Sequence, residues 1–233
     1  MKVGVTLPQF SDRADPAIDA AREAERLGLD GVFCFDHLWP IGQPDRPALS
    51  AWPLLGALAS STSAIGVGAL VARIGLLPDQ VLVSTLVGLS VISGGRMIAG
   101  LGTGDRLSRA ENEAFGIPFE PADERRRRVA AVAADVQSAG VPVWVGSGQD
   151  TTVELSRSLG ATVNLWDAAP ERVAELAGSG LDVTWGGPVG SDPAQATAQL
   201  AALAEAGASW AVCAWPDSLE VIAEAAGALA SPR

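Results

Sequence analysis

The stretch from Ser93 to Phe119, SGGRMIAGLGTGDRLSRAENEAFGIPF, contains a turn, a short strand and a glycine-rich loop that together indicate the fold. The strand runs from Met97 to Leu101 and ends in Gly102-Thr103-Gly104-Asp105. Glycines let the backbone of such a loop approach a ligand closely. A strand that ends in a loop carrying an acid is typical of the floor of a barrel active site. Because the same glycines also fit an ordinary tight turn, the interpretation depends on the rest of the chain.

Eight apolar runs of strand-like composition alternate with eight helix-like segments. The predicted strands are Val3–Leu7, Gly31–Phe35, Ile65–Val71, Met97–Leu101, Val143–Val145, Thr162–Leu165, Val183–Trp185 and Trp210–Ala214. The predicted helices are Asp15–Gly28, Ala51–Ser60, Pro78–Ile92, Ala122–Ser138, Thr151–Leu159, Glu171–Ala177, Pro193–Glu205 and Leu219–Leu229. Continuous apolar strands in this alternation are typical of a parallel sheet covered on both faces. We therefore predict an α/β fold, a single (βα)8 TIM barrel formed by residues 1–233 as one domain.

Composition excludes several classes of function. The net charge of -11 argues against a nucleic-acid partner. The chain has no uninterrupted apolar run long enough for a membrane span and enters a strand at its start, so neither a span nor a signal peptide is expected. Cys34 and Cys213 lie in predicted core strands without metal-type spacing, which indicates buried thiols in a reducing, cytoplasmic compartment.

Scarce residue types exclude two catalytic chemistries. The single lysine, Lys2, lies at the start of the first strand, at the wrong end of a barrel for a Schiff base. The single histidine, His37, cannot build a multi-histidine zinc site with two strand cysteines, so no metal site is expected.

Polar residues gather where the predicted strands end, which is where the chemistry of such a barrel belongs. They are Gln9, Asp36, His37, Thr103, Asp105, Ser147, Gln149, Asn164, Asp167 and Asp217. Four of the seven tryptophans are expected in the same zone, namely Trp39, Trp166, Trp185 and Trp215. A mouth with several flat aromatics, one imidazole and two acids suits a planar aromatic cofactor better than a small sugar phosphate.

Two further segments allow more than one interpretation. The loop Gly146-Ser147-Gly148-Gln149 precedes a predicted helix, so its backbone amides could bind an anion, or it could be a simple turn capped by Asp150 or Thr151. The run Glu124–Arg128 is predicted to be a solvated helix face or a subunit contact.

Four segments in chain order resemble the luciferase-like monooxygenase superfamily of (βα)8 barrels that bind FMN or the deazaflavin coenzyme F-420. They are the Asp36-His37 pair, SGGRMIAGLGTG with the following ENEAFGIPF, VPVWVGSGQD from Val141 to Asp150, and NLW from Asn164 to Trp166. Two departures accompany the resemblance. The chain is shortened between the predicted helix that ends at Ser138 and the strand at Val143, and Leu76-Leu77-Pro78 replaces an Arg-His-Pro sequence.

The resemblance implies that the cofactor ring lies across the barrel mouth, with a non-proline cis peptide near Gly68-Ala69 behind it. The cofactor phosphate would lie on Gly146, Ser147, Gly148 and Gln149, with Thr103 and Trp166 also at the cofactor. Asp36, His37 and Asp105 would line the reacting centre.

Hydride transfer requires an accompanying proton, which an imidazole and a carboxyl can supply or accept. An apolar mouth would raise the pKa of the acid, assigned to Asp105, while His37 could instead only pack against the ring. The sequence thus predicts an oxidoreductase that transfers hydride between coenzyme F-420 and a small organic substrate. An FMN-dependent monooxygenase and a non-catalytic cofactor-binding barrel are the alternatives. Apolar helices and the family resemblance suggest a homodimer.

Overall fold

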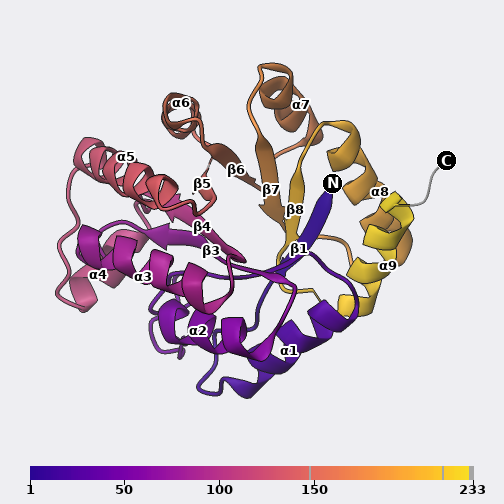
Figure 1. The fold of residues 1–233 in the computed structure, drawn as a ribbon, viewed down its shortest axis with the longest axis horizontal. Helices are drawn as coiled ribbons and strands as arrows, with labels where there is room; N and C mark the ends of the chain where they lie inside the picture. The colour runs from indigo at the N-terminus through magenta and orange to yellow at the C-terminus, as the bar shows by residue number, and fades with distance from the viewer. Residues whose placement is uncertain (147, 217, 231–233) are drawn as a thin grey trace.

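The computed structural model describes residues 1–146, 148–216 and 218–230, which form a closed parallel barrel surrounded by helices (Figure 1). Each strand pairs with the next along the chain, and the last pairs with the first. The strands are β1 (Lys2–Thr6), β2 (Gly31–Cys34), β3 (Gly66–Arg73), β4 (Met97–Gly102), β5 (Val143–Gly146), β6 (Thr162–Trp166), β7 (Val183–Gly187) and β8 (Trp210–Cys213). The predicted (βα)8 fold class is confirmed.

The helices follow the strands in alternation, with one addition. They are α1 (Asp15–Arg26), α2 (Ala51–Ser61), α3 (Asp79–Ile92), α4 (Ser108–Ala114), α5 (Ala122–Ser138), α6 (Asp150–Leu159), α7 (Pro170–Gly178), α8 (Pro193–Glu205) and α9 (Leu219–Ala230). Helix α4 lies within the segment that the sequence predicted as a loop. Just before its first turn, the carbonyl and the carboxylate of Asp105 both accept from the Ser108 amide, at 3.2 and 3.0 Å.

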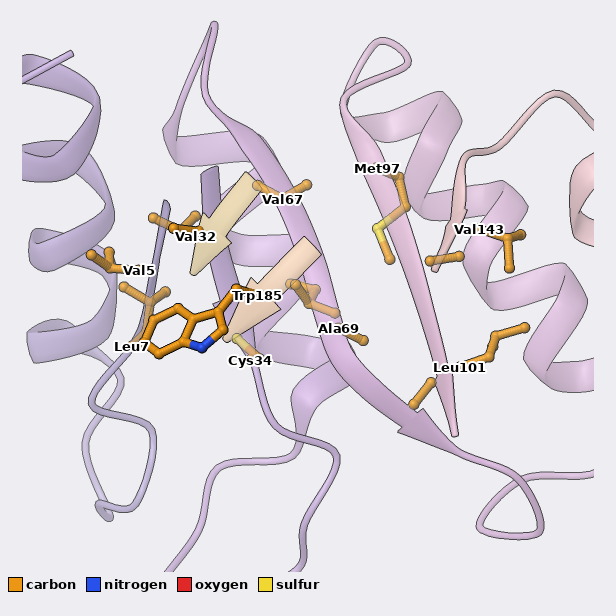
Figure 2. Packing of buried hydrophobic residues seen from close by; sticks show 14 of the residues in the cluster. Val5, Leu7, Val32, Cys34, Val67, Ala69, Met97, Leu101, Val143 and Trp185 are labelled. Carbon is orange, nitrogen blue, oxygen red and sulfur yellow. The ribbon is translucent and has the colours of Figure 1, made fainter. Parts of the chain in front are cut away.

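The main hydrophobic core lies between the strands and the surrounding helices. Figure 2 shows part of this layer, including Cys34 of β2, Ala69 of β3 and Trp185 of β7. Both cysteines are fully buried, as predicted. Among the described residues, no helix is both long and apolar enough to cross a membrane.

A second, smaller core fills the inside of the barrel near its N-terminal end. Phe33 stacks on Trp144 with ring centroids 5.3 Å apart, and Trp144 meets Trp210 edge to face at 5.4 Å. Gly31 and Gly68 make room for these rings, because a Cβ atom at either position would lie within 3.0 Å of the Phe33 ring. The aromatic cluster fills the barrel interior toward its N-terminal end, and the chemistry of such a barrel belongs at the opposite end, where the strands end.

Candidate active site at the mouth of the barrel

A cavity of about 720 Å³ opens at the C-terminal ends of the strands, within the size range of small-molecule sites. Phe10, Phe35 and Trp166 form its aromatic wall. Phe35 stacks on Phe10 at 6.0 Å and meets Trp166 edge to face at 5.7 Å. The two phenylalanines were not predicted, because each follows a strand as an ordinary apolar residue.

Only Trp166 of the four tryptophans expected at the mouth lines the cavity. Trp185 is buried in the outer core, where its indole N–H donates to the Ala168 carbonyl. Trp39 packs on Phe115 with ring centroids 5.5 Å apart, and Trp215 lies outside the lining. The sequence therefore placed three tryptophans at the mouth that do not line the cavity, and its aromatic wall consists of Trp166, Phe10 and Phe35.

The floor of the cavity contains a non-proline cis peptide between Leu70 and Val71, both of which line the cavity. The sequence placed this bond near Gly68-Ala69, two residues too early. The difference follows from the strand register: Gly68 faces the Phe33 ring inside the barrel and Ala69 faces the helix layer, so neither lines the mouth.

Glycines beside the floor leave space that a larger residue would fill. A Cβ atom on Gly102 would lie 2.4 Å from the Val71 side chain, and one on Gly146 would lie 3.1 Å from it. The Val71 side chain therefore lies against Gly102 of β4 and Gly146 of β5, two paired strands that carry no side chain at this level. The result is a flat surface of backbone and small groups, the shape that a planar ring requires.

His37 is the catalytic candidate that faces the cavity and is held by a buried partner. Its Nδ1 lies 2.9 Å from Oε2 of Glu111, and the other Glu111 oxygen accepts the Leu38 amide. Glu111 is 2% exposed and comes from α4, 74 residues further along the chain. Nε2 of His37 has no hydrogen-bond partner among the described residues.

Arg73 connects this pair to Asp36 behind the cavity wall. Its Nη2 lies 3.0 Å from Glu111 Oε2 as an ion pair without hydrogen-bond geometry. Its amide donates to Asp36 Oδ2 at 3.0 Å, its Nε donates to the Asp36 carbonyl at 2.8 Å, and its Nη1 donates to Asn112 at 3.3 Å. Sequence reasoning did not identify Arg73 or Glu111 as site residues; the ENEAFG motif, noted only as part of the resemblance, was the available signal.

Burial and charge act in opposite directions on the two buried acids. Burial raises the pKa of Asp36 to about 6, although the Arg73 amide and charge partly oppose it. Burial alone would also raise the pKa of Glu111, but His37, the Leu38 amide and Arg73 together lower it below its ordinary value. Glu111 is thus ionised near neutral pH, and it stabilises the tautomer of neutral His37 that carries its proton on Nδ1.

Of the two acids that the sequence placed at the reacting centre, Asp105 lines the cavity and Asp36 does not, so the prediction is wrong for Asp36. Asp105 lines the cavity but is exposed, and its carboxylate accepts both the amide and the hydroxyl of Ser108. Asp36 is 5% exposed and does not line the cavity. The acid with the raised pKa therefore lies behind the wall, while the acid at the mouth holds the loop before α4.

The remaining predicted cofactor residues divide into two groups. Thr103, Gly146, Gln149 and Trp166 line the cavity. Gly148 does not; it has φ +81°, and a Cβ atom there would lie 2.9 Å from Leu165. Ser147 and Asp217 lie outside the described residues. Gln9 is fully buried, where its side chain bonds both the amide and the carbonyl of Phe35.

The arginine run on α5 is not uniformly solvated. Arg125 is 7% exposed, donates to the Thr103 carbonyl at 2.6 Å and lies over the Phe119 ring at 4.0 Å. Arg125 and Arg126 both line the cavity, whereas Arg127 is exposed and pairs with Glu124. The predicted solvated face is therefore wrong for Arg125, because one turn of α5 faces the β4 loop.

Residues 1–133 match the model of a family described as luciferase-like monooxygenase. An F420-dependent hydroxymycolic acid dehydrogenase of Mycobacterium tuberculosis is 31% identical over 116 residues, 49% of this chain and 32% of the relative. An F420-dependent glucose-6-phosphate dehydrogenase of Beutenbergia cavernae is 31% identical over 125 residues, 53% and 35% of the two chains. These matches thus span about a third of each curated relative.

A solved structure shares the fold over almost its whole length. It is that of an F420-dependent secondary alcohol dehydrogenase in complex with an F420-acetone adduct, with a TM-score of 0.82 over 99% of both chains. Its sequence identity of 14% supports the fold alone.

Proposed function

The chain belongs to the luciferase-like monooxygenase family, and from that premise we propose that it is an oxidoreductase that uses coenzyme F-420. The reaction is hydride transfer between the deazaflavin and a small substrate that carries a hydroxyl group in its reduced form. The observation that carries the proposal is His37 beside an aromatic cavity. Buried Glu111 holds its Nδ1 at 2.9 Å, and no described residue bonds its Nε2. The names of the F420-dependent dehydrogenases among its relatives support the choice of cofactor.

The cavity fits a tricyclic cofactor in shape and in chemistry. Val71, Gly102 and Gly146 provide a flat floor, and Phe35 and Trp166 provide an apolar wall. Gln149 and Thr151 also line the cavity and lie at the N-terminus of α6, where free amides favour a phosphate group. Among the described residues, no group of three or more acids, histidines and cysteines is placed to hold a metal ion.

When bound, the deazaflavin would supply the hydride acceptor or donor. In substrate oxidation, Nε2 of His37 accepts the hydroxyl proton, and in the reverse direction it returns that proton to the carbonyl oxygen. Glu111 holds the ring in the tautomer that this step needs and stabilises the imidazolium that forms. Phe10, Phe35 and Trp166 keep water away from the reacting atoms.

Asp105 is the second group at the mouth that could contact substrate. We expect Asp105→Asn to lower turnover much more than it lowers cofactor affinity, measured by steady-state kinetics and fluorescence titration. An equal loss of turnover and cofactor affinity would contradict this role. It would indicate that Asp105 acts through its bonds with Ser108, which hold the loop before α4.

Titration of the purified protein with coenzyme F-420 and with FMN, followed by ring absorbance and fluorescence, tests the proposal. Tight binding of F-420 with weak binding of FMN is the expected result. A preference for FMN would support the monooxygenase instead. Binding of neither would contradict the proposal and favour a barrel without the family's chemistry.

We also propose that the protein assembles with a second copy of itself through α3. Val81 is 49% exposed, Val91 77% and Ile92 58%. Val81 and Ile92 lie three helical turns apart and so share a face of the helix. A second copy would remove this apolar surface from water.

A further inference from the structure

The charges that line the mouth cavity are opposite in sign to those of the whole chain. The net charge of the chain is -11. The lining nevertheless contains four arginines, namely Arg73, Arg106, Arg125 and Arg126, and Asp105 is its one aspartate or glutamate among the described residues. Glu111 pairs with Arg73, so the excess positive charge lies on the side formed by the β4 loop and α5.

Two of these arginines have no side-chain partner within the part of the chain that the structure describes. The side chains of Arg106 and Arg126 make no hydrogen bond or ion pair with any other described residue. Elsewhere on the same helix, Arg127 pairs with Glu124, and Arg128 pairs with Asp79 and Glu120. Asp105 forms no ion pair with either arginine among the described residues. Its carboxylate accepts from the amide and hydroxyl of Ser108, and its negative charge offsets one of the positive charges of the lining.

Arg125 fixes the geometry of this side. It donates to the Thr103 carbonyl at 2.6 Å and also to the Glu120 carbonyl, and it lies over the Phe119 ring. Arg109 lies over the same ring at 4.9 Å. Burial lowers the pKa of Arg125, and the charges of Arg109 and Arg126 lower it further, which Glu120 partly opposes. Like charges are thus held together by the fold, and a bound anion would relieve their repulsion.

We propose that Arg106 and Arg126 form an anion subsite of the mouth cavity that binds a phosphate or carboxylate group. Guanidinium groups bind both anions through paired N–H donors. The N-terminal turns of α5, at Ala122, and of α6, at Thr151 and Thr152, line the same cavity and add favourable dipoles. The anion belongs either to the cofactor's phosphate side chain or to the substrate. The assignment of the anion to cofactor or substrate rests on the proposed function, whereas the binding of an anion by the two arginines does not.

The first experiment uses inorganic phosphate as the probe. Its dissociation constant is obtained from the rise in melting temperature with phosphate concentration, at an ionic strength kept constant with chloride. We expect the Arg106→Gln/Arg126→Gln double variant to weaken phosphate binding at least about tenfold, as the loss of charged hydrogen bonds predicts. Arg22→Gln/Arg127→Gln, which removes two positive charges from exposed side chains outside the cavity lining, serves as control and should bind phosphate like the wild type. Equal binding by the double variant and the control, or no phosphate binding by the wild type, would overturn the proposal.

The second experiment identifies the source of the anion. The affinities for coenzyme F-420 and for the same deazaflavin without its phosphate-bearing side chain are compared in the wild type and the double variant. Selective loss of F-420 affinity assigns the subsite to the cofactor. Unchanged F-420 affinity, with arginine-dependent phosphate binding retained by the F-420-loaded protein, assigns it to the substrate. If no deazaflavin binds but phosphate binding still depends on the two arginines, the proposed function fails and the subsite stands.

Discussion

The contact between His37 and Glu111 predicts which ring nitrogen of His37 carries the proton, and ¹⁵N NMR can test this. Because the chain contains one histidine, its ring nitrogens can be observed in ¹⁵N NMR spectra without assignment. Glu111 accepts from Nδ1, so we expect neutral His37 to carry its proton there, whereas free imidazole side chains mostly carry it on Nε2. Glu111→Gln should move the ring toward a mixture of tautomers and lower turnover about tenfold or more with cofactor affinity retained.

Glu113→Gln provides the matched control. Glu113 lies on the same helix, but it is exposed and forms a long ion pair with Arg109 at 3.9 Å. It should leave both the spectrum and the turnover unchanged. A wild-type protein whose neutral histidine carries its proton on Nε2 would contradict the assigned role of Glu111.

Asp36 predicts how stability depends on pH. Burial raises its pKa to about 6 in the folded state, against about 3.9 in the unfolded chain. Between these two values the folded state holds the extra proton, so the favourable contribution is complete below pH ~4 and is lost as pH rises through about 6. Asp36→Asn should remove this dependence, so the difference in unfolding free energy between variant and wild type should shift by about 2 kcal/mol in favour of the variant between pH 4 and 7.5.

Urea unfolding at several pH values measures this shift, and Asp19→Asn on the exposed face of α1 serves as control. Glu111 contributes in the opposite sense, because its pKa is lowered and its contribution is lost as pH falls below its ordinary range. A constant difference between wild type and Asp36→Asn across the range would show that Asp36 is not the titrating group.

The pairing of β3 with β4 requires glycine at position 100, because the two backbones approach too closely there for a Cβ atom. A Cβ atom on Gly100 would lie 2.2 Å from the Ala69 carbonyl oxygen, which belongs to the backbone and cannot move aside. We expect Gly100→Ala to lower the free energy of unfolding by about 3 kcal/mol or to prevent folding, because the strands must separate. Gly178→Ala in α7 meets nothing within 4 Å and should be neutral or stabilising by up to about 1 kcal/mol. Similar unfolding midpoints for the two variants in urea would contradict this account.

The alternation of elements was predictable because strands buried on both faces and amphipathic helices leave a pattern in the sequence itself. The bounds of α5 and α8 agree with the prediction to the residue. Helix α4 was missed because it is short and is held in place by contacts of Glu111 with His37, Leu38 and Arg73, which lie far away in the sequence. The position of the cis peptide was misjudged because it accompanies a shift in register between β3 and β4, which involves a neighbouring strand and has no local signal.

The candidate site was predictable only in part, because contacts between segments distant in the sequence leave no local signal. Residues that follow strands, such as His37, Thr103 and Asp105, could be placed at the mouth from strand position alone. Glu111 and Arg125 reach the site from helices that fold back over the β4 loop. Their contribution depends on tertiary packing, so charge patterning in the sequence suggested solvent exposure for Arg125 instead.

At the scale of the whole molecule, the apolar face of α3 predicts the oligomeric state. Removing Val81, Val91 and Ile92 from water stabilises an assembly of two barrels, so we expect the protein to have the mass of a dimer by light scattering at micromolar concentration. The Val91→Glu/Ile92→Glu variant should shift to the monomer mass, because two carboxylates per copy would be buried without partners. Its circular dichroism spectrum should stay unchanged, since both side chains point away from the barrel core.

Leu107→Glu is the control for this test, because Leu107 is 62% exposed beside the mouth of the barrel and is not on α3. It should leave the dimer intact. A wild-type protein that remains monomeric at tens of micromolar would rule out the α3 contact. A dimer that survives Val91→Glu/Ile92→Glu would place the interface on another face, and the mouth cavity, which lies at the strand ends and not against α3, should keep its cofactor affinity in either state.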